Sequence, residues 1–219
     1  MLVSAFQLGH TRAGQSRIAE RPLVAELRLT RCRAPGLLSR SRRFDGSWLL
    51  RPDFSIMKIR RAKPTDANQL LEIYRPVVEN TAISFELTLP SEDDFAARIA
   101  SSIVSHDWFV MEGTSGLCGY AYATPHRARE AYEHSVETSV YVDTNYRGQG
   151  VGKGLYQALF SSLASLGYHN AYAGITLPNE PSVALHKSLG FEPIGVFREI
   201  GYKFGRWHDV SWWQRGINS

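Results

Sequence analysis

A glycine-rich turn between a predicted strand and a predicted helix constrains the fold more than any other part of this chain. Residues 136–142 are rich in valine and tyrosine and predict a β-strand, whereas apolar residues recur at helical spacing over 151–166. Between and just inside these elements stand Gly148, Gly150 and Gly152. Because glycine lets a backbone approach a ligand closely and the first amides of a helix lack acceptors, the turn predicts an anion-binding site.

Two common phosphate-binding patterns do not fit this turn. The P-loop pattern needs a glycine five residues before its Gly-Lys pair and a hydroxyl residue after it, but Arg147 and Gly154 occupy those positions. The dinucleotide pattern needs a final glycine where Lys153 or Leu155 stands. The turn is therefore not predicted to be either of these nucleotide-binding loops.

The composition predicts one domain with its own core, plus a tail. A chain of 219 residues is long enough for this. No apolar run approaches the length of about 18 residues that a membrane-spanning helix needs. Cys32 and Cys118 form neither a disulfide framework nor a metal-binding or redox motif, so a reducing cytoplasm is the expected location.

The net positive charge of the chain comes entirely from its first quarter. Residues 1–56 contain ten arginines and four acids, a formal charge of +6, whereas residues 57–219 contain fifteen basic and seventeen acidic residues, a formal charge of −2. Because the expected domain is not basic, nucleic-acid binding is not expected. Residues 1–56 could be an Arg-rich transit peptide. We prefer a disordered tail or a mis-assigned start upstream of Met57.

From Met57 onward the pattern predicts an α/β domain. Strands are expected over 58–62, 108–111, 117–124, 136–142 and 169–176, followed by a β-rich, aromatic stretch over 191–213. Three further helices are expected, the first capped by Thr65 or Asp66, the second starting at Ser91 and the third capped by Asn179 and ending at Gly190. Pro76 predicts a kink or a break late in the first of these helices.

The turn Arg147-x-x-Gly150-x-Gly152 resembles the acetyl-CoA signature of the GNAT N-acetyltransferases. Residues 81–85 and 185–191 resemble two other segments of that family, a substrate-side loop and a helix that ends at Gly-Phe. More narrowly, the resemblance is to phosphinothricin acetyltransferases and to relatives acting on methionine sulfoximine or sulfone, through residues 127–132, 135–142 and 201–210. It covers essentially all of 57–219. It implies the GNAT fold, a mixed central β-sheet with splayed central strands flanked by helices.

The resemblance implies acetyl-CoA as the co-substrate. In the GNAT fold the central strand splays from its neighbour, which leaves backbone amides free to bind the thioester carbonyl. Asn179 is implied to bond the pantetheine arm, although it could be a helix cap alone. The implied acetyl-CoA contacts are Val140, Tyr141, Val142, Arg147, Gly148, Gln149, Gly150, Val151, Gly152, Lys153 and Asn179.

Direct transfer to an amine needs a base, because an amine near neutral pH is mostly an ammonium ion and not nucleophilic. Glu137 lies on the strand that leads into the turn, and the resemblance implies that it is this base, directly or through water. The alternative is a carboxylate on the sheet surface with a salt-bridge partner. His186 stands where many GNAT enzymes have a tyrosine thought to protonate the leaving thiolate. It could be that acid or a structural partner on its helix.

Anionic groups of an acceptor need hydrogen-bond donors. Arg127 and Arg129 stand two residues apart in a predicted loop, close to Tyr132, and would suit a carboxylate or a phosphinate. Surface arginines are also often only solvated charges. Phe85 and Tyr141 are implied to line the acceptor pocket, although an aromatic residue on a strand ordinarily belongs to the core.

The chain is therefore expected to be a single-domain GNAT enzyme over residues 57–219. It would move the acetyl group of acetyl-CoA to the α-amino group of a small amino acid or its phosphinate, sulfoximine or sulfone analogue. A homodimer is implied by the resemblance, and no metal, nucleic acid or membrane partner is expected. Two alternatives stay open: acetylation of another amine, such as a protein N-terminus or an aminoglycoside, and a catalytically silent acyl-CoA or amino-acid sensor. The retained Glu137 argues against the sensor.

Overall fold

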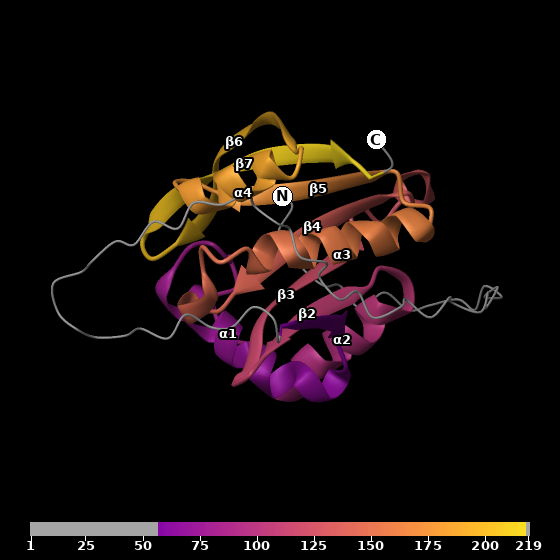
Figure 1. The fold of residues 1–219 in the computed structure, drawn as a ribbon. Helices are drawn as coiled ribbons and strands as arrows, with labels where there is room; N and C mark the ends of the chain where they lie inside the picture. Colours follow the sequence, from indigo (N-terminus) through magenta and orange to yellow (C-terminus); the bar gives the residue numbers. More distant parts are fainter. Residues whose placement is uncertain (1–56, 218–219) are drawn as a thin grey trace, which may run out of the picture.

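The computed structural model describes residues 57–217, so the expectations for residues 1–56 lie outside the described part of the chain. A seven-stranded sheet in the order β1-β2-β3-β4-β5-β7-β6 forms the centre (Figure 1). The strands are β1 (Lys58–Arg61), β2 (Trp108–Gly113), β3 (Gly116–Pro125), β4 (Ser135–Val142), β5 (Asn170–Thr176), β6 (Glu192–Lys203) and β7 (Arg206–Gly216). Neighbouring strands are antiparallel except β4 and β5, which are parallel. The predicted mixed α/β sheet is confirmed.

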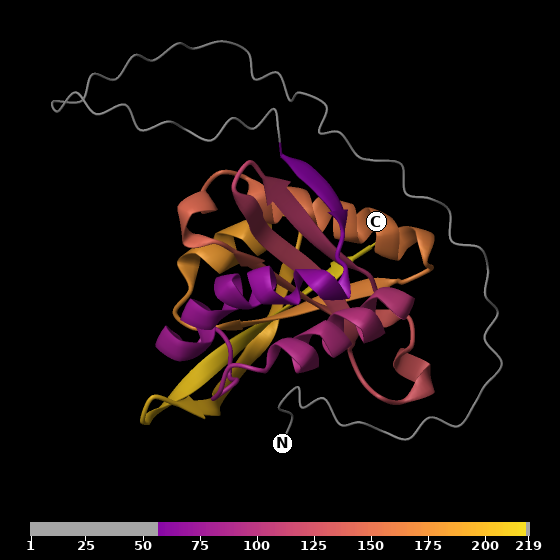
Figure 2. The same cartoon turned by 90° about the horizontal axis from the view of Figure 1, so that it is seen from below.

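Helices cover both faces of the sheet. The α-helices are α1 (Ala67–Asn80), α2 (Glu92–Ser105), α3 (Val151–Ser165) and α4 (Glu180–Ser188). Short 3-10 helices are η2 (Pro64–Asp66), η3 (Glu130–Tyr132) and η4 (Thr144–Tyr146). Figure 2 shows α1 and α2 together on one side of the sheet and α3 on the other. Val183 and Leu185 of α4 pack against the same apolar cluster as α3, so both helices belong to a different layer from α1 and α2.

Each layer has its own apolar core, because side chains alternate between the two faces of a strand. In β2, Val110 packs with α1 and α2, whereas Met111 packs against α3. In β4, Val140 lies on the α3 side and Tyr141 on the α1–α2 side. The register of β4 thus sends Glu137, which shares the parity of Tyr141, to the α1–α2 side.

The central strands β4 and β5 separate after Glu137. Strand β4 pairs with β3 from Val136 to Val142, but it pairs with β5 only where Ser135–Glu137 lies opposite Asn170–Tyr172. At the end of the paired stretch the Thr138 hydroxyl donates to the Tyr172 carbonyl at 3.2 Å. The predicted splay of the central strands is therefore present.

The helix ends follow local chemistry, with two corrections. The Ser91 hydroxyl accepts from the Asp94 amide at the start of α2, as expected for a cap. Asp66 precedes α1 but does not cap it, because its carboxylate is taken by Arg60 and by the Lys63 amide. Helix α1 also continues past Pro76 to Asn80, so the predicted break is absent, and buried residues on both sides of the proline hold the helix against the sheet; the kink stays a prediction.

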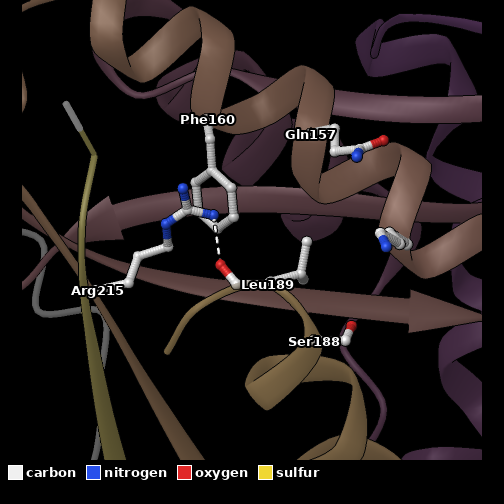
Figure 3. A pocket seen from close by; sticks show the side chains of 6 residues that line it. Gln157, Phe160, Ser188, Leu189 and Arg215 are labelled. Carbon is white, nitrogen blue, oxygen red and sulfur yellow. Dashed lines mark hydrogen bonds between the residues drawn. The ribbon is translucent and has the colours of Figure 1, made fainter. Parts of the chain in front are cut away.

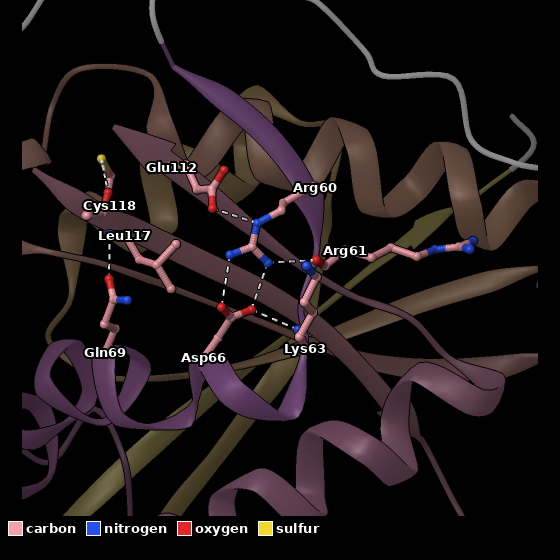
Figure 4. A network of polar contacts seen from close by, with 9 residues as sticks. Arg60, Arg61, Lys63, Asp66, Gln69, Glu112, Leu117 and Cys118 are labelled. Carbon is pink, nitrogen blue, oxygen red and sulfur yellow. Dashed lines mark hydrogen bonds and ion pairs between the residues drawn. The ribbon is translucent and has the colours of Figure 1, made fainter. Parts of the chain in front are cut away.

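Arg60 ties the first strand to the first helical segment and to β2 (Figure 4). Its guanidinium donates to both Asp66 oxygens at 2.7 and 2.9 Å, and to Glu112 at 2.7 Å. Burial alone would raise the pKa of Asp66, but the hydrogen bonds from Arg60 and from the Lys63 amide outweigh it and lower that pKa. The ionised carboxylate is therefore the form that stabilises this corner of the fold.

We expect Asp66→Ala to lower the free energy of unfolding by about 2 kcal/mol, because it leaves the half-buried Arg60 guanidinium without its two-point partner. Urea unfolding at neutral pH measures this. Glu79→Ala is the control, since Glu79 forms only an exposed pair with Arg75 at 3.5 Å, and it should change stability by less than about 0.5 kcal/mol. Because the folded-state pKa of Asp66 is lowered, its contribution is present above the ordinary carboxyl range. The difference from wild type should shrink as the pH falls below that range.

Candidate active site

The glycine turn adopts the shape that an anion site at a helix start requires. Gly148 and Gly150 have φ values of +71° and +84°, in the left-handed region that favours glycine. Gly150 is the N-cap of α3, and its carbonyl accepts the first helical bond from the Gly154 amide at 2.9 Å. The amides of residues 151–153 therefore have no acceptor within the helix and emerge at its positive end.

Side chains brace the turn from below. Arg147 donates from Nε to the Val142 carbonyl at 3.3 Å, and the side-chain amide of Gln149 donates from Nε2 to the Asn145 carbonyl at 2.8 Å. Val151 and Gly152 are buried, and a Cβ on Gly152 would come within 3.1 Å of the Leu185 side chain of α4. These residues therefore offer a ligand their backbone, while their side-chain positions let α3 and α4 approach.

A pocket of about 360 Å³ continues from the turn along α3 (Figure 3). Its lining residues are Lys153, Gln157, Phe160, Ser188, Leu189 and Arg215. The Arg215 guanidinium lies 4.5 Å from the centre of the Phe160 ring and donates to the Leu189 carbonyl at 2.6 Å. One wall of the pocket is thus fixed by Arg215, and Lys153 brings a positive charge to its rim.

The splayed part of β4 presents backbone amides to the gap. The Asp143 amide donates to the Cys118 carbonyl of β3, and the Ser135 carbonyl accepts from the His126 amide. Because backbone groups alternate between the two edges of a strand, the odd-numbered residues of β4 bond to β3. The amides of Val140 and Val142 therefore point to the side from which β5 has departed, whereas that of Tyr141 is engaged with β3.

Glu137 occupies the last paired position before the gap. It lies opposite Thr124 of β3 and Tyr172 of β5. Burial raises the pKa of its carboxyl to about 7, although the positive charge of Arg127 opposes the shift. A carboxyl group that titrates near neutral pH is well matched to accept a proton there.

His126 contacts Glu137, and the sequence analysis did not identify it. Its Nδ1 lies 3.0 Å from Oε1 of Glu137, and its ring stacks on Tyr172 with 4.4 Å between ring centres. Burial, and then the charge of Arg127, lower the pKa of this imidazole. A histidine just beyond a strand end carries no sequence signal for such a contact, because only the strand register brings it to Glu137.

The residues expected to bind acceptor anions lie in the connection between β3 and β4. Arg127, Arg129 and Tyr132 are exposed there, and the Tyr132 ring centre is 6.3 Å from that of His126. The charge of Arg127 acts on Glu137, so the fold brings Arg127 close to that carboxyl group. Arg129 is the N-cap residue of η3, in the same loop.

Phe85 is held against the β6–β7 hairpin by a buried lysine. The Lys203 ammonium donates to the carbonyls of Val78 and Ser84, both at 2.7 Å. The Phe85 ring covers Gly201 so closely that a methyl group there would overlap it. Lys203 was not predicted to act here, because its two acceptors are more than a hundred residues away in the chain.

Tyr141 joins a group of aromatic side chains on the face shared with Glu137. Its ring centre lies 4.9 Å from that of Tyr74 and 5.2 Å from that of Tyr120. The Tyr74 hydroxyl in turn contacts the Ser84 hydroxyl at 2.6 Å, which links this group to the Phe85 segment. Tyr141 is half-buried, so it packs with the core and is also partly exposed on the face of β4 that it shares with Glu137.

A left-handed glycine turn at a helix start, beside a splayed strand that carries a glutamate, thus lies at the centre of the described fold, and this part of the chain matches a known family. The family model described as "Acetyltransferase (GNAT) domain" matches residues 59–212. The chain belongs to the GNAT acetyltransferase family. The predicted family is confirmed.

Several relatives are named for small amino-acid-like substrates. A phosphinothricin N-acetyltransferase of Streptomyces coelicolor is 36% identical over 76% of this chain and 99% of the relative. An L-methionine sulfoximine/L-methionine sulfone acetyltransferase of Salmonella typhimurium is 33% identical over 72% of this chain and 93% of the relative. A phosphinothricin acetyltransferase from Sinorhizobium meliloti, solved with AcCoA, has a TM-score of 0.70 at 36% identity, covering 73% and 88% of the two chains.

Against this GNAT background, the surroundings of His186 match the structural alternative. Its Nδ1 lies 2.8 Å from the Ser182 carbonyl and its Nε2 lies 3.1 Å from the Tyr156 hydroxyl. Burial lowers the pKa of the imidazole, which favours the neutral ring. A neutral ring that donates to Ser182 and accepts from Tyr156 has both nitrogens engaged. Its role as the general acid stays a prediction.

Asn179 is a helix cap, as the alternative interpretation allowed. Its side-chain oxygen accepts from the Ser182 amide at 3.3 Å at the start of α4. Its contact with a pantetheine arm stays a prediction. Among residues 57–217, no group of three His, Cys, Asp or Glu side chains is arranged to hold a metal ion. In the same part of the chain, no helix is both long and apolar enough to cross a membrane.

Proposed function

We propose that this GNAT protein transfers the acetyl group of acetyl-CoA to the α-amino group of a small amino acid or an analogue such as phosphinothricin, methionine sulfoximine or methionine sulfone. One observation carries the proposal: Glu137, with a pKa raised to about 7, lies where β4 leaves β5 and exposes backbone amides. The names of the relatives support the substrate class.

The residues present fit acetyl-CoA as the acetyl donor. The amides at the start of α3 and the two left-handed glycines suit a pyrophosphate, with Lys153 at the rim of the adjoining pocket. The Val140 and Val142 amides would bind the thioester carbonyl oxygen and stabilise the negative charge that develops on it. Backbone donors held by a sheet need no reorganisation during the reaction.

Glu137 would accept a proton from the substrate ammonium ion, directly or through one water molecule. The free amine then attacks the thioester carbonyl, the new C–N bond forms and the C–S bond breaks, so that CoA leaves as a thiolate. The attacking nitrogen loses its second proton in this step and the thiolate takes up one proton through water, which gives the amide and CoA as the free thiol. No covalent enzyme intermediate is needed. Because both nitrogens of His186 are engaged, the geometry favours a proton source for the thiolate other than that residue.

The acceptor would approach from the α1–α2 side of the sheet. Arg127 and Arg129 are the donors that we assign to its carboxylate or phosphinate, and Tyr132 lies beside them. Phe85 and Tyr141 are the residues that we assign to the opposite border of this acceptor site, on the same α1–α2 side of the sheet. A surface of this composition suits a short zwitterion with an anionic tail better than a polycationic aminoglycoside.

We expect Glu137→Gln to lower kcat by about 100-fold or more, because general-base catalysis of this kind contributes about 10² to 10⁴. The assay is thiol release from acetyl-CoA with phosphinothricin, methionine sulfoximine, methionine sulfone, ordinary amino acids and peptide N-termini. Binding of CoA, measured by calorimetry, should be retained. In wild type, kcat/KM should rise with pH through about 7 and level off above it, since the deprotonated carboxylate is the active form.

Glu133→Gln is the matched control, because Glu133 is an exposed glutamate in the adjacent loop. It should leave kcat and the pH profile unchanged. Turnover by Glu137→Gln at the wild-type rate would remove Glu137 from the mechanism. Turnover of peptides alone would keep the base and replace the substrate class, and CoA binding without any turnover would favour the sensor.

Gly201→Ala should raise KM for the acceptor by about tenfold, since it displaces the Phe85 ring from β6, and leave KM for acetyl-CoA unchanged. Gly195→Ala on the same strand is the control, because no atom lies within 4 Å of a Cβ at that position. Steady-state kinetics with each substrate varied in turn measure both effects. Equal acceptor KM values for the two variants would show that Phe85 does not line the acceptor pocket.

We further propose that the protein is a homodimer through β6. This strand is at the edge of the sheet and exposes an apolar surface, with exposed fractions from 39% for Ile200 to 58% for Trp207 on the hairpin that it forms with β7. An edge strand with such a face is rarely left uncovered. Sedimentation should give twice the chain mass at micromolar concentration, and Phe197→Glu should give the monomer. A monomeric wild type would contradict the proposal.

A further inference from the structure

His126 is the part of the candidate site that neither the glycine turn nor the acceptor loop accounts for. It follows β3 directly, and its amide donates to the Ser135 carbonyl at 3.2 Å, so its backbone is fixed to the start of β4. This places the imidazole over the side chain of Glu137, two residues further along β4. The side chain of His126 is 13% exposed and that of Glu137 is 28% exposed.

Aromatic rings hold the imidazole in one orientation. It stacks on Tyr172 at 19° between ring planes, and it meets Trp212 and Tyr132 edge-on, with ring centres 6.1 and 6.3 Å away. A ring enclosed in this way can tilt little without losing these contacts. Nδ1 therefore stays directed at Oε1 of Glu137, at 3.0 Å.

The charges around the pair favour a neutral imidazole. The titratable groups that face it or Glu137 are Arg127, Tyr122, Tyr132 and Tyr172, and of these Arg127 is the positive one. Burial and Arg127 both lower the pKa of His126. A neutral ring can donate from one nitrogen only. Opposite an ionised carboxylate, a protonated Nδ1 is attractive and a bare Nδ1 lone pair is repulsive.

We propose that His126 is a positioning residue for Glu137: its Nδ1–H donates to Oε1, stabilises the ionised carboxylate and leaves Oε2 for the substrate ammonium ion. This proposal rests on the proposed function of Glu137 as the base. Burial alone disfavours the ionised form, and a hydrogen bond to that form offsets part of this effect. His126 thereby keeps the base available at neutral pH.

The first experiment replaces the ring nitrogens and keeps the ring. His126→Phe should move the acidic limb of kcat/KM upward by about one pH unit or more, because the buried carboxylate loses a charge-assisted hydrogen bond. KM for acetyl-CoA should not change. His134→Phe is the control, because His134 also stands beside a glutamate but its side chain is 70% exposed. An acidic limb that stays at its wild-type position in His126→Phe would overturn the proposal.

His126→Asn provides a second variant, since its side-chain amide can place a donor near the Nδ1 position. It should return the acidic limb toward the wild-type position, whereas a purely steric role of the ring predicts a loss without this return. If His126→Phe does not fold, as judged by circular dichroism, the comparison of His126→Asn with wild type carries the test. A larger displacement of the limb in His126→Asn than in His126→Phe would contradict the donor role.

The second experiment needs no turnover, so it separates failure of this proposal from failure of the proposed function. Nitrogen NMR of the full chain labelled at histidine should show the proton of neutral His126 on Nδ1. The spectrum is recorded above pH 7, where Glu137 is ionised and His126 is neutral. A proton on Nε2 under these conditions would overturn the proposal even if no acceptor is found.

Discussion

The parting of β4 from β5 after Glu137 is the constraint on which the rest of the site depends. Two parallel strands that stay paired would consume the amides of Val140 and Val142 in the sheet. Once they separate, those amides need another acceptor, because a buried amide without one is costly. The Thr138 hydroxyl satisfies the Tyr172 carbonyl at the branch point, so the separation begins without leaving that acceptor empty. The gap, the position of Glu137 at its edge and the amide donors thus arise from a single change in pairing.

Burial raises the pKa of Glu137, and the charge of a neighbouring arginine limits that rise. A carboxyl in an apolar, aromatic setting is driven toward its protonated form. Arg127 opposes this by its charge, and His126 contacts the carboxylate directly. The opposing effects of burial and of the Arg127 charge leave the pKa at about 7, where the group can both take up and release a proton. Strong burial or strong pairing alone would have moved the pKa away from that range.

The two substrates are assigned to opposite layers, and separate contacts shape each layer. On the α3 side, Gly152 lets α3 and α4 pack closely while the helix start stays open. On the α1–α2 side, Lys203 fixes the segment around Ser84 to the hairpin, and Phe85 rests on Gly201. A buried lysine between two carbonyls is well suited to this task, because its ammonium group satisfies both at once. Under the proposed assignment, changes on the α1–α2 side would alter acceptor preference without disturbing the acetyl-CoA side.

The sequence by itself determined the family, through several segments that resemble it. It also determined the succession of strands and helices along the chain and the turn at Gly148 and Gly150, because caps, periodicity and left-handed glycines act over a few residues. It also singled out Glu137. It failed where distant residues compete: Asp66 binds Arg60 instead of capping α1, and packing carries α1 past Pro76. Only the tertiary structure decided that His126 faces Glu137 and that His186 is enclosed by Tyr156 and Ser182. Those contacts depend on strand register and helix packing, which no local pattern encodes.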